Sequence, residues 1–258
     1  MGKINGWVDI HAHFTPPTTA EAREAQWRQL RDAHLLAPEP YDWQPETMLA
    51  TMDRLGIAVQ MLSPVPVDPP LPRLRAWNDY GAQLLFIHPS AVPPTFRQTS
   101  VLVELPFETT RTVVDLLYAG FFRRYPRLTV VLAHCGGALP ALSGRLGLLG
   151  AEEYVFNPLG LTADDIRTDL AKLYLDTAAA GTDANLAAAV TMVPRDHLVY
   201  GADAGVPCSN ENNMTRNIDA LQNSHVLTRQ EVDALGHRAF DLFPAAAQRH
   251  RDAIAAAA

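Results

Sequence analysis

Hydrophobic stretches alternate with amphipathic ones along the chain, and this alternation predicts strands separated by helices. Six short runs are almost entirely apolar, as buried parallel strands are. These runs lie at residues 6–13, 57–63, 84–88, 128–134, 172–178 and 197–203. Between them, segments such as ETMLATMDRLG carry apolar residues at helical spacing, with Pro45 before the segment and Gly56 at its end. The pattern therefore predicts an α/β fold with a parallel sheet covered by helices.

The alternation continues without a linker or an internal repeat, so we expect one domain over residues 1–258. We also expect a helical insertion at about 15–42 and a helical tail at the C-terminus. A chain of 258 residues has the length of a TIM-type (β/α)8 barrel, which typically has about 250. Only six strands can be counted, and two further strand–helix units would need about 60 more residues.

Composition narrows the class of protein. The apolar fraction of 48% is sufficient for a large core, and the net charge of −7 with scattered basic residues excludes nucleic acid and membrane as main partners. No apolar run reaches the roughly 20 residues that span a bilayer, and the first residues do not resemble a signal segment. Cys135 and Cys208 are too few for a disulfide framework, and we expect both to be buried thiols. These features favour a cytoplasmic enzyme.

Four of the predicted strands end on residues of the types that bind metals in proteins. They are His11 and His13 in VDIHAHF, His88 in LLFIHPS, His134 in LTVVLAHCGG and Asp203 in HLVYGADAG. In a barrel of parallel strands the carboxyl ends converge on one mouth, where active sites lie. Imidazoles with a carboxylate suit a catalytic zinc ion that keeps an open position for water or substrate. Manganese is the alternative, because one ligand is a carboxylate.

Plainer interpretations exist for each residue. A single strand histidine is usually packed in the core, but two histidines at i and i+2 project to the same side of a strand. His134 is either a further ligand or a general acid/base, since imidazole titrates near neutral pH. Asp203 is a ligand or a hydrogen-bond partner of a histidine. Asp176, which ends its own strand, either supports a ligand or caps a helix.

The remaining candidates have weaker support. His197 lies at the opposite end of its strand from Asp203, which predicts a structural role. Four histidines in helical or polar contexts are predicted to be surface residues: His34, His225, His237 and His250. Arg97 and Arg145 are candidates to hold a substrate carboxylate by a bidentate contact.

Ordered stretches over nearly the whole chain carry a resemblance to a known family. They are DIHAHFTPP, MDRLGI, FIHPS, FETTR, YPRLTVVLAHCGGALP, LYLDTA, YGADAG and LFP. Together they resemble the amidohydrolase-related metal enzymes, in particular the decarboxylases that act on aminocarboxymuconate semialdehyde, 6-methylsalicylate and hydroxybenzoates. The resemblance implies a distorted (β/α)8 barrel that works as a homodimer or larger assembly. It also implies a metal held by His11, His13, His88 and Asp203, with His134 as the acid/base and Asp203 sharing that role.

Two departures from the family pattern qualify these expectations. Strands three and four of the barrel are missing before FIHPS, and Ala204-Gly205-Val206-Pro207 replaces the family's aromatic-proline pair after Asp203. The leading hypothesis is metal-dependent, non-oxidative decarboxylation of a small aromatic or unsaturated carboxylic acid. The alternatives are a metal-dependent hydrolase of a lactone or amide and an inactive, truncated metal-binding remnant.

Overall fold

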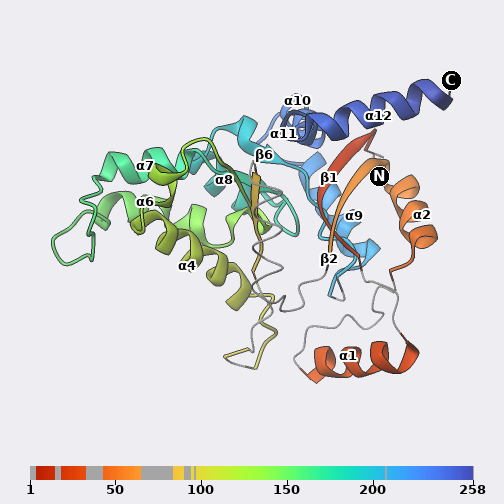
Figure 1. Cartoon of the computed structure of the whole chain (residues 1–258), viewed down its shortest axis with the longest axis horizontal. Helices are drawn as coiled ribbons and strands as arrows, with labels where there is room; N and C mark the ends of the chain where they lie inside the picture. The colour runs from red at the N-terminus through yellow and green to blue at the C-terminus, as the bar shows by residue number, and fades with distance from the viewer. Residues whose placement is uncertain are drawn as a thin grey trace.

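Six parallel strands and the helices around them form the centre of the molecule (Figure 1). The computed structural model describes residues 4–14, 19–32, 43–64, 84–89, 94–95, 97–206 and 208–257. Its strands are β1 (Trp7–Phe14), β2 (Ile57–Pro64), β3 (Leu84–Ile87), β4 (Thr129–Leu132), β5 (Tyr174–Asp176) and β6 (Leu198–Val199). Each strand begins within two residues of the start of a predicted apolar run. The predicted α/β class is confirmed.

Helices follow the strands in the predicted alternation. They are α1 (Ala20–Asp32), α2 (Pro45–Leu55), α4 (Glu104–Tyr118), α5 (Phe121–Arg124), α6 (Leu139–Leu149), α7 (Ala163–Ala171), α8 (Asp183–Met192), α9 (Glu211–Gln222), α10 (Arg229–His237), α11 (Ala239–Leu242) and α12 (Pro244–Ala257). Helix α1 is the described part of the predicted insertion and lies apart from the strands (Figure 1). The rest of that insertion lies outside the described residues. The sequence also predicts a proline-rich loop up to residue 72 and a helix over LRAWNDYGAQ, and residues 65–83 are likewise outside the described ranges. None of the helices in the described ranges is long and apolar enough to cross a bilayer.

Two parallel sheets are joined at the ends of the first and last strands. One sheet pairs β1 with β2, and the other has the order β3-β4-β5-β6. The chain beyond β6 continues along β1, where the Ile10 N–H donates to the Tyr200 carbonyl (3.2 Å) and Ala12 forms a parallel bridge with Ala204. The strand order is therefore β2-β1-β6-β5-β4-β3, and within the described residues β2 and β3 are not paired with each other. This is the place at which the two missing strands of the barrel were predicted.

Side chains from all six strands meet in one interior cluster. It comprises Val8, Ile10, Val131 and Val199, with Val59, Met61, Phe86 and Tyr174 packed against them. Residues of α11 and the turn after it, among them Ala239 and Phe243, belong to the same cluster. Strands that share one interior must curve around it, as barrel strands do. A second, larger cluster fills the space between the strands and the surrounding helices.

Two helical regions differ from the sequence prediction. The stretch FETTRTVVDLLYAGFFRRYP predicts a single helix over residues 107–126. In the structure it is divided into α4 and α5, because Gly120 adopts a positive φ of 74°. Helix α9 was not predicted. Asn210 caps this helix by accepting a hydrogen bond from the Asn213 N–H (2.9 Å).

Replacing Gly236 of α10 by alanine should destabilise the protein. A methyl group there would lie 2.5 Å from three atoms of the buried Trp7 indole, so the ring or the helix must shift. Such overpacking lowers the free energy of unfolding by about 1–3 kcal/mol, which urea denaturation measures. Gly144→Ala in α6 is the matched control, because no atom from another part of the described structure lies within 4 Å of the added carbon. Equal stability of the two variants would contradict the prediction.

Candidate metal centre

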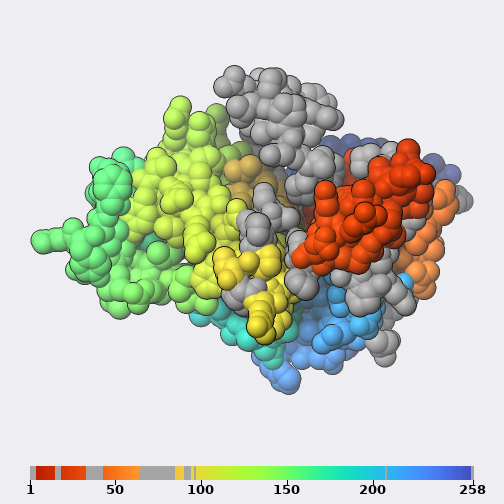
Figure 2. All heavy atoms as spheres, turned by 90° about the horizontal axis from the view of Figure 1, so that it is seen from below, coloured from red at the N-terminus to blue at the C-terminus, as the bar shows by residue number. Residues whose placement is uncertain are grey.

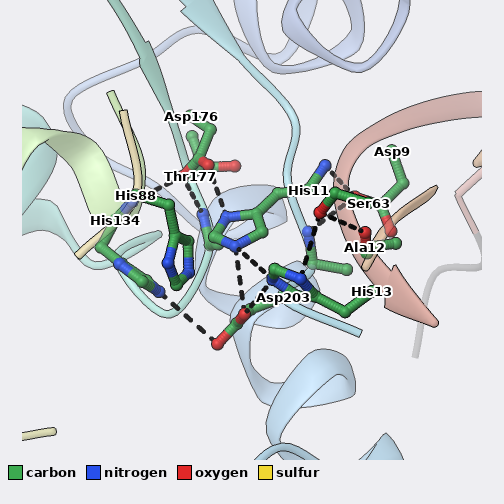
Figure 3. A network of polar contacts seen from close by, with 12 residues as sticks. Asp9, His11, Ala12, His13, Ser63, His88, His134, Asp176, Thr177 and Asp203 are labelled. Atoms are coloured by element: carbon green, nitrogen blue, oxygen red, sulfur yellow. Dashed lines mark hydrogen bonds and ion pairs between the residues drawn. The ribbon is translucent and has the colours of Figure 1, made fainter. Parts of the chain in front are cut away.

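The carboxyl ends of four strands bring the five predicted site residues together (Figure 3). His11 and His13 lie near the end of β1, whereas His88, His134 and Asp203 follow β3, β4 and β6. Both β1 histidines face the same point, since their Nε2 atoms are 3.2 Å apart. A register shift between Asp9 and Ala12 interrupts the β1–β2 pairing at this position, as bulges next to sites often do.

Asp203 lies among the imidazoles. Its Oδ1 is 3.1 Å from Nε2 of His11 and 3.4 Å from Nε2 of His13, and its Oδ2 is 3.5 Å from Nε2 of His134. One donor atom from each of His11, His88, His134 and Asp203 can be chosen so that all four lie within 4.8 Å of one another. His13 is not in that group, although it contacts two of the same side chains.

In three of the histidines Nδ1, the ring nitrogen opposite to Nε2, contacts a neighbouring polar group. The Nδ1–H of His11 donates to Asp176 (2.6 Å), and the Nδ1–H of His88 donates to the carbonyl of Pro89 (2.7 Å). Nδ1 of His13 lies 3.1 Å from the hydroxyl of Ser63. A hydrogen bond at Nδ1 fixes the orientation of each ring and directs Nε2 toward the centre, as metal-binding histidines require.

These residues fit a divalent ion. Nε2 of His88 is buried and has no hydrogen-bond partner among the residues that the structure describes, and it belongs to the same group of donor atoms as the Asp203 carboxylate. Buried polar atoms are nearly always paired, so this unpaired nitrogen needs a cation or a proton donor beside it. Imidazole nitrogen and carboxylate oxygen suit zinc, and the carboxylate is also compatible with manganese.

Asp176 supports two of the site residues from behind. Its side chain is fully buried and accepts hydrogen bonds from Nδ1 of His11 and from the backbone N–H groups of His134 (2.8 Å) and Ala178 (2.9 Å). The N-cap of α8 is Thr182, so Asp176 does not cap that helix. Of the two interpretations left open by the sequence, the geometry favours support of a histidine.

Backbone strain is concentrated at the same place. His134, Cys135 and Asp203 are non-glycine residues with φ of 52°, 56° and 55°. Each such residue costs about 1–3 kcal/mol and persists only where the surroundings enforce it. The hydrogen bond from the His134 N–H to Asp176 is one such constraint. Two of the five predicted site residues, His134 and Asp203, are therefore held in a strained backbone conformation by their surroundings.

Charges in the site are strongly coupled. Burial lowers the pKa of His11, but the carboxylates of Asp176 and Asp203 outweigh it and raise the pKa to about 10. Burial and the neighbouring rings of His11 and His134 lower the pKa of His88 to about 3. Burial opposes ionisation of Asp203, yet the imidazoles hold its pKa well below the usual range. In the metal-free protein His11 is therefore cationic and His88 neutral at pH 7.

Metal affinity should rise with pH. Because the pKa of His11 is about 10 in the metal-free protein, its Nε2 carries a proton at neutral pH, whereas a ligand nitrogen must be unprotonated. The dissociation constant of the metal should fall about tenfold per pH unit between about pH 7 and 9, with about one proton released per ion. Competition with a chromogenic chelator measures the constant, and calorimetry in two buffers counts the proton. A constant that does not change with pH would contradict this prediction.

The histidines and cysteines that were not predicted as ligands can also be compared with the structure. His197 bonds the Leu173 carbonyl through Nδ1 (3.0 Å) and stacks on Tyr174, which agrees with a structural role. Cys135 is buried as expected, whereas Cys208 is only partly buried, which corrects the expectation for that residue. Burial raises the pKa of both thiols to about 12, as in inert thiols. His225, His237 and His250 are outside the centre, and His34 lies outside the described residues.

The two predicted arginines, Arg97 and Arg145, are exposed, and neither forms an ion pair with another described residue. Their predicted contact with a substrate stays a prediction. One buried polar residue of the site region was missed by the sequence analysis, namely Asp9, whose pKa burial raises to about 7. The signal was a charged residue inside the apolar run of β1.

Comparison with known proteins gives consistent matches. A family model described as Amidohydrolase matches residues 31–244. A decarboxylase (yanB) of Aspergillus niger is 30% identical over 141 residues, which are 49% of this chain and 38% of that protein. The 6-methylsalicylic acid decarboxylase (acuB) of Aspergillus aculeatus is 30% identical over 168 residues, 62% of this chain and 50% of that protein. The chain thus spans half or less of the length of these relatives.

Solved structures share the fold at low sequence identity. An amidohydrolase II has a TM-score of 0.68 at 16% identity, covering 92% of this chain and 99% of that chain. The complex of 2,6-dihydroxybenzoate decarboxylase with 2,6-dihydroxybenzoate has a TM-score of 0.67 at 16% identity, covering 93% and 99%. A manganese-containing 5-carboxyvanillate decarboxylase of Novosphingobium aromaticivorans has a TM-score of 0.66 at 16% identity, covering 93% and 96%. The predicted barrel-type fold class is confirmed by this likeness.

Proposed function

Because this chain belongs to the amidohydrolase family, we propose that it is a metal-dependent decarboxylase of a small aromatic or unsaturated carboxylic acid. The main support is the convergence of four imidazoles on Asp203 at the carboxyl ends of the strands (Figure 3). The names of the relatives favour decarboxylation over hydrolysis, since the matched curated proteins are named decarboxylases and two of them are named for 6-methylsalicylic acid. The ligand chemistry alone is compatible with both reactions.

We assign the metal to four ligands, His11, His13, His88 and Asp203. Zinc is the ion we propose, because imidazole nitrogens and carboxylate oxygens are the ligand types of catalytic zinc sites, and manganese is the alternative. Two solved relatives of the same fold contain manganese. When bound, a divalent ion supplies Lewis-acid chemistry and orients the acidic substrate.

His134 is the group that we propose moves the proton. Its Nε2 lies on the edge of the ligand cluster, 3.5 Å from Oδ2 of Asp203, and its side chain is 17% exposed. In the reaction Nε2–H would donate to the ring carbon that bears the carboxylate. The bond from that carbon to the carboxylate then breaks, its electron pair restores the conjugated system, and CO2 leaves. The partial exposure of His134 allows solvent to return the proton, while Asp203 orients the ring.

The experiment is a CO2 assay with the protein loaded with zinc or manganese. Suitable probes are 6-methylsalicylate, 2,6-dihydroxybenzoate and 5-carboxyvanillate, since the matched proteins are named for them. We expect CO2 and the decarboxylated product in equal amounts from at least one acid, and none after chelation. Ring opening of a lactone probe without CO2 would instead support the hydrolase alternative. Metal analysis of the same sample identifies the ion.

Removing the metal should also destabilise the protein. An ion present at about a thousand times its dissociation constant stabilises the folded state by about 4 kcal/mol. We expect thermal denaturation at a lower temperature after chelation, with recovery when zinc or manganese is added. A broad transition that is unchanged by either ion would support the inactive-remnant alternative.

The assembly and location of the protein are further proposals. The resemblance to the decarboxylase branch supports a homodimer or larger assembly, which analytical ultracentrifugation tests directly. Both cysteines are free, which supports a reducing compartment such as the cytoplasm.

A further inference from the structure

Asp9 is a buried carboxylate in the strand that carries the first two ligands. It lies between Val8 and Ile10 on β1, and its side chain is not exposed to solvent. A buried carboxylate is costly unless its oxygens accept hydrogen bonds. Asp9 accepts three: Oδ1 from the backbone N–H groups of His11 and Ala202 (2.9 Å each), and Oδ2 from Nε2 of Gln60 (2.8 Å). The side chain therefore joins three separate segments.

The two bonds to Oδ1 come from segments that carry ligands. His11 is itself a proposed ligand, and Ala202 directly precedes Asp203. The register of β1 on β2 shifts between Asp9 and Ala12, so the regular ladder is interrupted where the His11 N–H lies. Oδ1 of Asp9 thus accepts the hydrogen bonds of two backbone N–H groups, those of His11 and Ala202, in place of a carbonyl of a neighbouring strand. The shared acceptor sets the distance between the two segments.

Asp203 is consequently fixed on both sides. On one side the Ala202 N–H donates to Asp9, and on the other the His13 N–H donates to the Ala204 carbonyl (2.6 Å). Both partners belong to β1. With φ of 55°, Asp203 needs such restraints, because a free chain would relax to a more favourable conformation.

We propose that Asp9 is a positioning residue of the metal centre, which holds His11 and Asp203 at ligand spacing through the two hydrogen bonds to its Oδ1. This inference rests on the metal centre proposed above and adds a residue that does not touch the ion. It requires an acceptor oxygen at this position and not a negative charge. Asparagine retains the oxygen, and Gln60 can turn its buried Oε1, which lacks a partner among the described residues, toward the new amide.

The test compares metal affinity in three variants of the full chain. Asp9→Ala removes both bonds to Oδ1 and should weaken zinc and manganese binding by about 10- to 100-fold, the usual effect of losing a group that orients ligands. Asp9→Asn should bind within about threefold of the parent, because the acceptor is kept. Asp169→Ala is the control, since Asp169 is a buried carboxylate on α7 that bonds Lys172 far from the ligands along the chain. It should lose stability without losing affinity.

Chelator competition gives the dissociation constants, and urea denaturation of the metal-free proteins gives the stabilities. A folded Asp9→Ala with the parent's affinity would overturn the inference while leaving the metal centre intact. If Asp9→Ala does not fold, Asp9→Asn decides. A folded Asn variant that binds the metal tenfold more weakly than the parent would show that the negative charge of Asp9 is needed, which contradicts the inference. A parent protein that binds neither ion would overturn both the proposed function and this inference.

Discussion

Replacing His134 by alanine should lower the rate of CO2 release by about 10²–10⁴-fold while the metal stays bound. The ring supplies the proton in the proposed reaction, and its loss leaves binding and orientation of the substrate in place. Alanine keeps the backbone strain at φ of 52° and the hydrogen bond from the backbone N–H to Asp176, so stability should change little. Single-turnover kinetics with the best acid, together with metal analysis of the variant, measure both quantities.

His88→Ala is the matched control for that experiment. His88 is assigned as a ligand, so its loss should remove metal and activity together, whereas His134→Ala should lose activity alone. Both residues belong to the group of donor atoms within 4.8 Å of one another, which makes the comparison decisive. Loss of the metal in His134→Ala would make His134 a ligand, and equal rates in His134→Ala and the parent would remove it from the mechanism.

Replacing Asp176 by alanine should lower the free energy of unfolding by about 3–5 kcal/mol, as breaking a fully buried ion pair does. The change leaves the cationic His11 with one fewer carboxylate and leaves the N–H groups of His134 and Ala178 without an acceptor. Metal affinity should fall as well, because Nδ1 of His11 is no longer fixed. Urea denaturation with and without the ion separates the two effects.

An exposed aspartate–histidine pair provides the control for Asp176. Asp233 and His237 face each other at 3.9 Å on α10, with side chains 70% and 41% exposed. Asp233→Ala should change the stability by no more than about 0.5 kcal/mol. If Asp176→Ala lowers the free energy of unfolding by an equally small amount, the buried network stabilises the protein no more than a surface pair does.

Local sequence predicted the strands and the residues that gather at their carboxyl ends, because both signals are short in range. A run such as LTVVLAH contains its strand and its terminal histidine within seven residues, so no tertiary information is needed to find them. Helix α2 was equally clear, since Pro45 and Gly56 mark its ends. Convergence of the ligands then followed from the rule that parallel strands in a barrel open toward one mouth.

Features that depend on contacts between distant segments could not be predicted in this way. The hydrogen bond from Ala202 to Asp9 joins β1 to the segment after β6, a strand of the other sheet, and no pattern in either segment indicates it. Helix α9 was missed because its sequence, ENNMTRNIDALQ, is mostly polar and forms a helix through its Asn210 cap and its packing. The division between α4 and α5 depends on a single glycine whose φ is set by the tertiary structure.

The bridge from Ala12 to Ala204 has a consequence for biosynthesis. β1 is synthesised long before Asp203, so for most of translation the nascent polypeptide lacks the carboxylate of the proposed ligand set. In that proposal, the full set assembles only after Asp203 has emerged from the ribosome and its segment has paired with β1. A polypeptide that stops before that aspartate should therefore be released without the ion.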